Sequence, residues 1–381
     1  MSLLSSGLGL PKPFFRVPIS LVAERDKRSA FPPPIILSPL LVVLFMSISH
    51  AATIIVGGPC TLVDAITAAE TDAAVGNCAT GAGNDDIVLT TDIVLSLASG
   101  TTGFEPTGLP PITTSITIHG NGYTISRAAA AANFMLITVA SSGILRLETV
   151  TLSGGSGTST GAIENAGNLT LQSTTIANNH GQNCGGIINK NVLNVMDSLF
   201  VGNSSSGNAG AIFNYSGTAL LSNTTISGNS SAFAGGFNNS ASFSTKPAAI
   251  ATLDHCTVSG NSATFSGQNF LNQNDAQLTL KATLINGADN CQGNAPTIDG
   301  GLNFGSDGSC TGTAPLTGFD AVLRNNGGPS MTHALLPGSS AIDIGGACGL
   351  TDQRGLVRDS HCDSGSFEYL DRIFVNGFEL P

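Results

Sequence analysis

The sequence predicts an all-β protein, a single-stranded parallel β-helix with a short N-terminal helical cap. Three observations support this prediction. Apolar positions recur in register along the chain, short runs of Thr, Ile, Val and Leu alternate with small residues, and Gly is abundant at 47 of 381 residues. Charged residues make up only 10% of the chain, unlike a disordered protein. No window of the repeats has the spacing of an amphipathic helix, which excludes helical repeats.

The first 51 residues differ from the rest. Basic residues precede the apolar run Pro34–Ile48, and small residues follow it. The basic residues are Lys12, Arg16, Arg25, Lys27 and Arg28. This order predicts a signal peptide, residues 1–51, cleaved after Ala51. The alternative is a membrane anchor, which the shortness of the run and its prolines Pro34 and Pro39 disfavour.

The mature chain is strongly acidic. Cleavage removes five basic and two acidic residues from the 14 and 25 in the chain, which leaves a formal charge of −14. Such a surface repels nucleic acid and anionic polysaccharide unless a local basic patch or a metal ion intervenes. No later segment is apolar enough to span a bilayer. We therefore expect neither a nucleic-acid partner nor an integral membrane span after cleavage.

All eight cysteines follow the predicted cleavage point, which favours disulfides in an exported chain. Their spacing predicts the local bridges Cys60–Cys78, Cys291–Cys310 and Cys348–Cys362. Cys184 and Cys256 remain, and two or more coils between them exceed the reach of a disulfide. We expect these two to be buried free thiols that act as small apolar side chains.

Two columns of residues define the repeat. The first consists of Leu152, Ile176, Phe200, Ile226, Val258 and Leu284, with Asn179, Asn203, Asn229 and Asn261 three positions after its middle members. The second consists of Ile163, Ile187, Ile212 and Phe237, each preceded by Gly-Ala or Gly-Gly. Inward residues alternate with period two, so each coil of about 24 residues consists of short strands. Stacked Asn amides can hydrogen-bond between coils, and Gly allows a tight corner.

A short helix is expected before the first coil. Leu62, Ala65, Ile66 and Ala69 fall on one helical face, with Thr61 and Asp64 at capping-box spacing. A helix here would cover the open edge of the first coil.

Several segments resemble known families. The segment Cys60–Cys78, with "NDDIVL" after it, resembles the CSLREA-type domain of bacterial exported β-helix proteins, although Val63-Asp64 stands where that domain has an Arg-Glu or Arg-Asp pair. The "GAI" and "GGI" phrases, alternating with "FVGN" at Phe200–Asn203, are similar to repeats of polymorphic outer-membrane proteins. Asn325–Glu368 resembles the choice-of-anchor Q domain, and "DRIFVNGFE" resembles a short C-terminal tail of exported chains.

These resemblances imply a right-handed, pectin-lyase-like β-helix, secreted or held at the cell surface, in a Gram-negative bacterium. The families carry no agreed activity, so they imply no catalytic residues. The expected organisation is a signal peptide (1–51), a CSLREA-like cap (52–84), β-helix coils (85–290), a disulfide-stapled C-terminal cap (291–368) and a tail (369–381).

Few side chains in the coils suggest catalysis. Asp197 and His255 fall in one corner column, with Asp254 beside His255, about 10 Å apart along the axis at the usual strand spacing. This is near the carboxylate separation of an inverting glycosidase. Corner positions also face water, where Asp and His are ordinary turn residues, and we favour that interpretation.

The densest charged cluster follows Cys348. It contains Asp352, Arg354, Arg358, Asp359, His361 and Asp363. A binding role is conceivable, but the bracketing cysteines favour a stapled loop that caps the last coil. His119, His180 and His333 stand apart in sequence and indicate no metal site, and no motif indicates a cofactor.

The favoured function is that of a non-catalytic exported protein that presents a rigid face for adhesion or carbohydrate contact, with a glycan or cell-surface ligand as partner. The alternatives are a passive spacer and a polysaccharide-degrading enzyme, a hydrolase rather than a lyase, that uses Asp197 with Asp254 or His255. The sequence does not indicate an oligomeric state.

Overall fold

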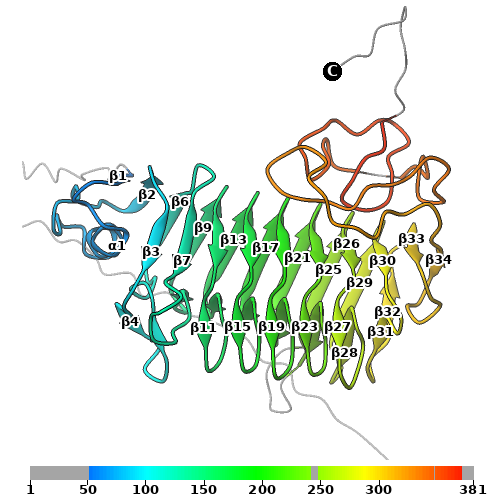
Figure 1. The fold of residues 1–381 in the computed structure, drawn as a ribbon, viewed down its shortest axis with the longest axis horizontal. Coiled ribbons are helices and arrows are strands. Elements are labelled where there is room, and N and C mark those ends of the chain that lie inside the picture. Colours follow the sequence, from blue (N-terminus) through cyan, green and yellow to red (C-terminus); the bar gives the residue numbers. More distant parts are fainter. Residues whose placement is uncertain (1–50, 242–247, 347, 371–381) are drawn as a thin grey trace, which may run out of the picture. The chain divides into compact units, whose positions relative to one another are not determined.

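The computed structural model describes residues 51–241, 248–346 and 348–370. Within these residues the chain winds through coils, and the strands of the four main sheets pair in parallel with the matching strands of the next coil (Figure 1). The predicted parallel β-helix is therefore confirmed. Nearly all of the predicted signal peptide, and the tail after residue 370, lie outside the described residues.

Each regular coil passes through four strands in a fixed order. The first sheet consists of β1 (Thr53–Val56), β2 (Asn84–Leu89), β6 (Ser115–His119), β9 (Ile144–Glu148), β13 (Asn168–Gln172), β17 (Val192–Met196), β21 (Thr218–Ser222), β25 (Ile250–Asp254), β29 (Gln277–Lys281) and β32 (Thr297–Asp299). The second sheet consists of β3 (Ile93–Leu95), β7 (Thr124–Arg127), β10 (Thr151–Ser153), β14 (Thr175–Ala177), β18 (Leu199–Val201), β22 (Thr225–Ser227), β26 (Thr257–Ser259), β30 (Leu284–Asn286), β33 (Asn303–Gly305) and β34 (Thr313–Pro315).

Two further sheets complete the coil. The short sheet consists of β11 (Ser156–Gly157), β15 (His180–Gly181), β19 (Ser204–Ser205), β23 (Ser230–Ser231) and β27 (Ser262–Ala263). The third sheet consists of β8 (Ile137–Val139), β12 (Ile163–Asn165), β16 (Ile187–Asn189), β20 (Ile212–Tyr215), β24 (Phe237–Ser240), β28 (Phe270–Gln273) and β31 (Cys291–Gln292). An antiparallel pair, β4 (Gly100–Thr101) and β5 (Pro106–Thr107), projects from an early coil.

The core is a stack of inward apolar side chains. Ile176, Phe200, Ile226 and Val258 are direct partners in successive strands of the second sheet, and each is 0% exposed. Burial of this apolar area, at roughly 25 cal/mol per Å², is the main stabilising contribution. The predicted first column is confirmed from Leu152 to Val258.

The prediction for the last residue of this column is wrong by one position. Ile285, not Leu284, pairs with Val258, and Leu284 pairs with Thr257 on the outward side. A one-residue shift moves a side chain to the other face of a strand. The corner before this strand is also shifted by one residue. Ala282 has a φ of 44°, so it is the equivalent in this coil of the positive-φ corner residues Asn223 and His255.

Two ladders of buried asparagines run from coil to coil. In the predicted ladder, the Nδ2 of Asn179 donates to the Oδ1 of Asn203 (3.0 Å), Asn203 to Asn229 (2.9 Å) and Asn229 to Asn261 (2.9 Å). The ladder residues themselves do not have left-handed backbone. The residue that precedes each of them does, such as Asn178 before Asn179 or Gly202 before Asn203. The second ladder, which was not predicted from the sequence, consists of Asn165, Asn189, Asn214, Asn239 and Asn272.

Glycine precedes the third sheet because the coils approach closely there. A Cβ on Gly185 would lie 2.5 Å from the backbone oxygen of Gly210 and from the nitrogen of Ser204 in the next coil. No side chain fits such a gap, since all the obstructing atoms are backbone. The repeated "GAI" and "GGI" phrases are therefore scaffold, as predicted.

The N-terminal end is covered as expected. Helix α1 (Leu62–Thr71) packs beside β1 and β2 (Figure 1), and it is capped by Thr61, whose side chain accepts a hydrogen bond from the backbone of Asp64. The buried face of α1 consists of Leu62, Ala65, Ile66, Ala68 and Ala69. The disulfide Cys60–Cys78 closes the loop around the helix.

The C-terminal region differs from the expectation in two ways. First, the coils continue beyond residue 290, because β31 to β34 extend the third, first and second sheets to Pro315. Second, the segment 316–370 does not cap the last coil. Its described residues, 316–346 and 348–370, lie against the outward face of the second sheet beside β26 (Figure 1), and hydrogen bonds join them to Thr225 of β22 and Thr257 of β26.

Small polar side chains make this lateral contact. The Thr225 hydroxyl lies 2.6 Å from Oε1 of Gln353 and 2.9 Å from Oγ of Ser366, and the backbone of Ser366 donates to Thr257 (3.0 Å). A small apolar cluster adds to it: Leu284, Phe304, Leu335, Ala341 and Phe367. The outward position of Leu284 therefore has a packing reason.

Candidate functional site: a groove on the third sheet

The predicted corner residues Asp197 and His255 do share a column. Asn223 lies between them, and all three have positive φ. The Asn223 amide donates to Asp197 (3.2 Å) and to the backbone oxygen of Thr351 (2.9 Å), and its oxygen accepts from Arg358 (3.1 Å). Burial raises the pKa of Asp197, and Asp352 raises it further. The column is thus a contact region in which the coils are hydrogen-bonded to the segment 316–370.

Asp254 lies beside this contact region and forms an ion pair with Lys281. The Nδ1 of His255 lies 2.6 Å and the Nζ of Lys281 2.7 Å from its two oxygens. Burial alone would raise the pKa of Asp254, but the bonds from His255 and Lys281 outweigh it and hold the pKa below its usual value. A carboxyl with a lowered pKa is a poor general acid near neutral pH.

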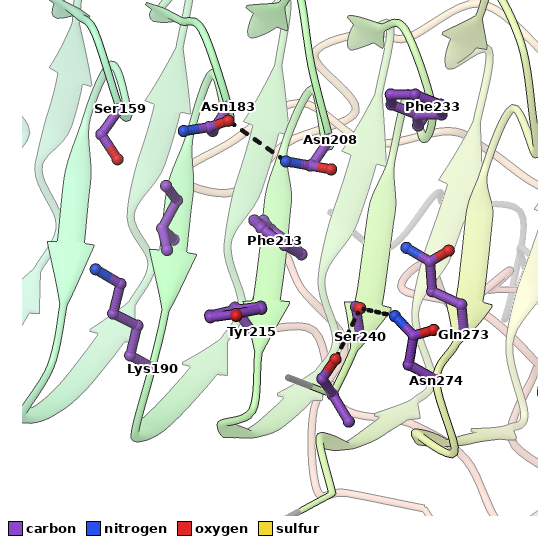
Figure 2. A pocket seen from close by; sticks show the side chains of 12 residues that line it. Ser159, Asn183, Lys190, Asn208, Phe213, Tyr215, Phe233, Ser240, Gln273 and Asn274 are labelled. Carbon is purple, nitrogen blue, oxygen red and sulfur yellow. Dashed lines mark hydrogen bonds between the residues drawn. The ribbon is translucent and has the colours of Figure 1, made fainter. Parts of the chain in front are cut away.

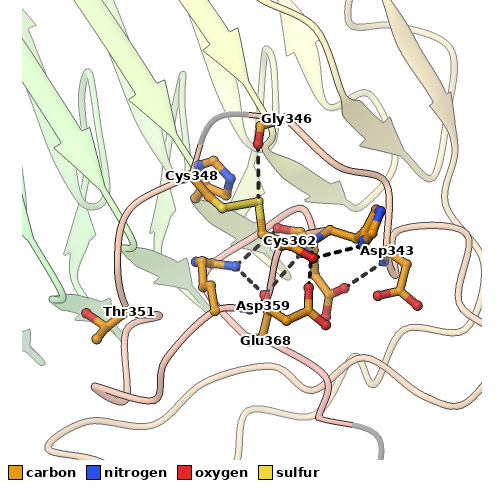
Figure 3. The surroundings of a disulfide bond; sticks show 12 residues. Asp343, Gly346, Cys348, Thr351, Asp359, Cys362 and Glu368 are labelled. Carbon is orange, nitrogen blue, oxygen red and sulfur yellow. Dashed lines mark hydrogen bonds and ion pairs between the residues drawn. A yellow bond between two sulfur atoms is a disulfide. The ribbon is translucent and has the colours of Figure 1, made fainter.

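The charged cluster of the segment 316–370 is mostly internal. Arg358 is buried and donates to Glu368 (2.8 Å), while Arg354 pairs with Asp352 (2.7 Å). The disulfide Cys348–Cys362 closes the same loop, and Glu368 and Asp359 lie beside it (Figure 3). The Arg358 guanidinium also donates to the backbone oxygens of Asp363 and Gly365, although its Nε has no partner among the described residues, so these contacts hold the loop together as the predicted stapled loop requires. Exposed Asp359 and His361 lie at its edge.

The cysteines are arranged as the spacing predicts. The third disulfide joins Cys291 and Cys310, and Cys184 and Cys256 are free and buried. Burial raises the pKa of both thiols to about 12. Such thiols are not nucleophiles at neutral pH. Among the residues that the structure describes, no group of three His, Cys, Asp or Glu side chains can hold a metal ion.

A groove of about 560 Å³ lies on the outward face of the third sheet (Figure 2). It crosses the coils from β12 to β28. Its lining consists of Ser159, Asn183, Ile188, Lys190, Asn208, Phe213, Tyr215, Phe233, Ser240, Ala241, Gln273 and Asn274. These residues come from equivalent positions of successive coils, so the groove is a product of the stacking.

The floor of the groove is apolar. Ile188 and Phe213 are outward partners in neighbouring strands of the third sheet, and they pack on buried Cys184 and Ala209. The ring of Phe213 lies 5.4 Å from that of Tyr215, tilted by 44°. Cys184 therefore packs as a small apolar side chain beneath this floor, outside the main core.

Amide and hydroxyl groups line both rims. Asn183 and Asn208 occupy one rim and are joined by a long bond of 3.5 Å, whereas Asn274 donates to Ser240 (3.0 Å) on the other (Figure 2). Phe233 continues the first rim, 41% exposed, with its ring 5.9 Å from that of Phe265. An apolar floor between polar rims can bind a ligand that has both apolar faces and many hydroxyl groups.

A second hollow of about 360 Å³ adjoins the groove and shares Ser159 and Lys190 with it. It holds Glu105, which accepts hydrogen bonds from the backbone of Thr158 and Ser159, and exposed Phe104. Burial raises the pKa of Glu105. Since its oxygens face backbone donors of a neighbouring coil, Glu105 anchors the β4–β5 projection to the coils.

The groove was not predicted from the sequence. The signal was present at the outward positions after Ile187 and Ile212 of the second column, where the apolar residues Ile188 and Phe213 stand. No helix of the described residues is long and apolar enough to cross a membrane.

Comparison with known proteins gives one family. The family model described as "Putative pectate lyase-like adhesive domain" matches residues 67–184, less than a third of the chain. No curated protein and no solved structure matches. The matched residues include part of α1, the early coils and the first rim of the groove as far as Asn183. This part of the chain is similar to a pectate lyase-like adhesive domain.

Proposed function

We propose that this chain is a non-catalytic extracellular adhesive protein that contacts carbohydrate through the groove on the third sheet. The observation that carries the proposal is the apolar floor of Ile188 and Phe213 between rims of amides and hydroxyls. A sugar ring presents C–H groups on its faces and hydroxyls at its edge. Aromatic rings pack against the first, and Asn and Gln amides both donate to and accept from the second.

Other features support the proposal. The matched family is described as adhesive, and three disulfides suit an oxidising, extracellular location. A stack of coils held by buried ladders is rigid, so little conformational entropy is lost on binding.

The test of this proposal is to measure binding of the purified chain, residues 52–381, to a glycan array. Retention on a subset of glycans is expected, with Phe233→Ala weakening it. Leu220→Ala is the matched control, because Leu220 is similarly exposed, at 48%, on the outward face of the first sheet. Absence of glycan retention would contradict the proposal and favour a spacer.

The same preparation tests the enzymatic alternative. Incubation with polysaccharides, followed by assays for reducing ends and unsaturated products, is expected to show no turnover. Release of product that disappears in Asp197→Asn or Asp254→Asn would show a hydrolase and overturn the non-catalytic proposal.

A further inference from the structure

We infer that the groove selects an uncharged, linear glycan that lies along the stacking direction and contacts several coils at once. This inference rests on the proposed function and names its ligand class. It has three physical components: the repeat of the lining residues, the placement of the aromatic rings, and the balance of charge in the groove.

The lining repeats once per coil. Ser159, Asn183, Asn208 and Phe233 precede the paired residues Thr160, Cys184, Ala209 and Ala234 in successive coils, so they form one row. Neighbouring strands lie about 4.8 Å apart, so this row of four positions extends roughly 14 Å. A linear oligosaccharide also repeats its hydroxyls and C–H faces along its length. Each added sugar therefore meets a new set of side chains, and affinity should rise with chain length.

Aromatic rings lie at more than one point along this direction. Phe213 and Tyr215 are in the middle of the groove, and Phe233 and Phe265, the latter 74% exposed, are near one end. Phe104 is fully exposed in the adjoining hollow. Exposed rings contribute binding energy when a ligand face covers them. Aromatic rings on different coils can contact different sugars of one chain, so they favour an extended ligand over a single sugar.

The charge in the groove is balanced. Among the described residues that line it, Lys190 is the cation, and its Nζ lies 2.5 Å from Oε1 of Glu164. The chain as a whole carries a formal charge of −11. A carboxylated or sulfated glycan would therefore meet a neutralised lysine within a negative field, which disfavours binding. Similarity to a pectate lyase-like domain does not make pectate the ligand.

The experiment measures affinity by calorimetry for two series of equal chain lengths, one neutral and one acidic, at physiological ionic strength. One series runs from cellobiose to cellohexaose, and the other from the disaccharide to the hexasaccharide of galacturonic acid. We expect the neutral series to gain about tenfold in affinity from the shortest to the longest member, and the acidic series to bind weakly. Phe233→Ala should lower the affinity for the hexasaccharide about tenfold, whereas Leu220→Ala should not.

A charge variant tests the cause directly. Glu164→Gln removes the partner of Lys190 while keeping the shape of the side chain. Affinity for the acidic hexasaccharide should rise several-fold in this variant, and that for cellohexaose should not change. Melting temperatures of all the variants close to that of the wild-type chain would show that folding is retained.

Each remaining outcome decides the inference. Tighter binding of the acidic series by the wild-type chain, equal affinity for all lengths, no binding of either series, or insensitivity to Phe233→Ala would overturn it. Retention on the glycan array would then still support carbohydrate adhesion, so the failure of the inference is distinct from failure of the proposed function.

Discussion

At the scale of single residues, stacked asparagines connect each coil to the next. The Asn203 amide donates to the oxygen of Asn229 (2.9 Å) and to the backbone oxygen of Ile176 (2.8 Å), and its own oxygen accepts from the backbone of Asn179 (3.1 Å). Every one of these atoms is shielded from water. A buried polar group without a partner costs about 1–3 kcal/mol, so a ladder stabilises the stack only when it is complete.

We therefore expect Asn203→Ala to lower the free energy of unfolding by about 2–3 kcal/mol, because it leaves several buried groups unpaired. The measurement is urea denaturation followed by circular dichroism. Asn183→Ala is the control, since Asn183 is exposed on the groove rim and should change stability by less than about 0.5 kcal/mol. Equal effects of the two substitutions would contradict the ladder as a stabilising feature.

A single carboxyl makes the segment 316–370 sensitive to pH. Asp363 accepts from the backbone of Asp343 (2.8 Å). Burial, with Glu368 and Asp343 nearby, raises the pKa of Asp363 to about 7. The ordinary value in an unfolded chain is about 3.9. The folded state therefore binds more protons between these values, so the contribution of Asp363 to stability is present below about pH 4 and is lost as the pH rises through about 7.

Asp363→Asn should remove this dependence, because Asn remains neutral. The difference in denaturation midpoint, variant minus wild type, is expected to increase between about pH 5 and about pH 8. Exposed Asp359→Asn provides the comparison and should show a constant difference over that range. A constant difference for Asp363→Asn as well would show that this carboxyl does not control the pH dependence.

At the scale of elements, the docking of the segment 316–370 depends on a few hydroxyls of β22 and β26. Thr225→Val keeps the shape of the side chain but leaves Oε1 of buried Gln353 without the Thr225 hydroxyl. We expect a loss of about 1–3 kcal/mol from this contact. Proteases should then cleave within 316–370 faster than in the wild type, while the coils resist. Thr252→Val on the outward face of the first sheet is the control, and simultaneous cleavage of coils and segment would contradict independent docking.

The elements also show what could be predicted from sequence. Inward positions repeat because each must fill the same dry interior, so Ile176, Phe200 and Ile226 reveal the stack. Outward positions are constrained only by their local neighbours. Hence the outward Ile188 and Phe213 are a signal on two coils only, too short to stand out as a repeat, and the contact of Thr225 with Gln353 was not predicted from the sequence. The register at Leu284 was misread because an apolar residue can face outward when another segment covers it.

At the scale of the whole molecule, the described coils behave as a quasi-one-dimensional stack. Thr151, Thr175 and Leu199 are partners in consecutive strands, and Asn165 and Asn189 are ladder neighbours. In such an arrangement stability is approximately a sum over coils and their interfaces. One complete coil should therefore be removable without changing the register of the others.

Deletion of residues 175–198 joins Thr174 to Leu199 and removes one full period. The chain should still fold, with a smaller free energy of unfolding, because Leu199 then stacks on Thr151 and the ladders close across the gap. Deletion of 175–197 removes one residue fewer and is the matched control. It leaves one extra residue at the junction, so the strand that follows must turn its apolar side chains outward or bulge, and this variant should be less stable than the full-period deletion or should aggregate. Folding of both deletions, or failure of both, would contradict a stack of equivalent coils. Since Asn183, Ile188 and Lys190 leave with the deleted coil, the folded variant should also bind glycans more weakly than the full chain.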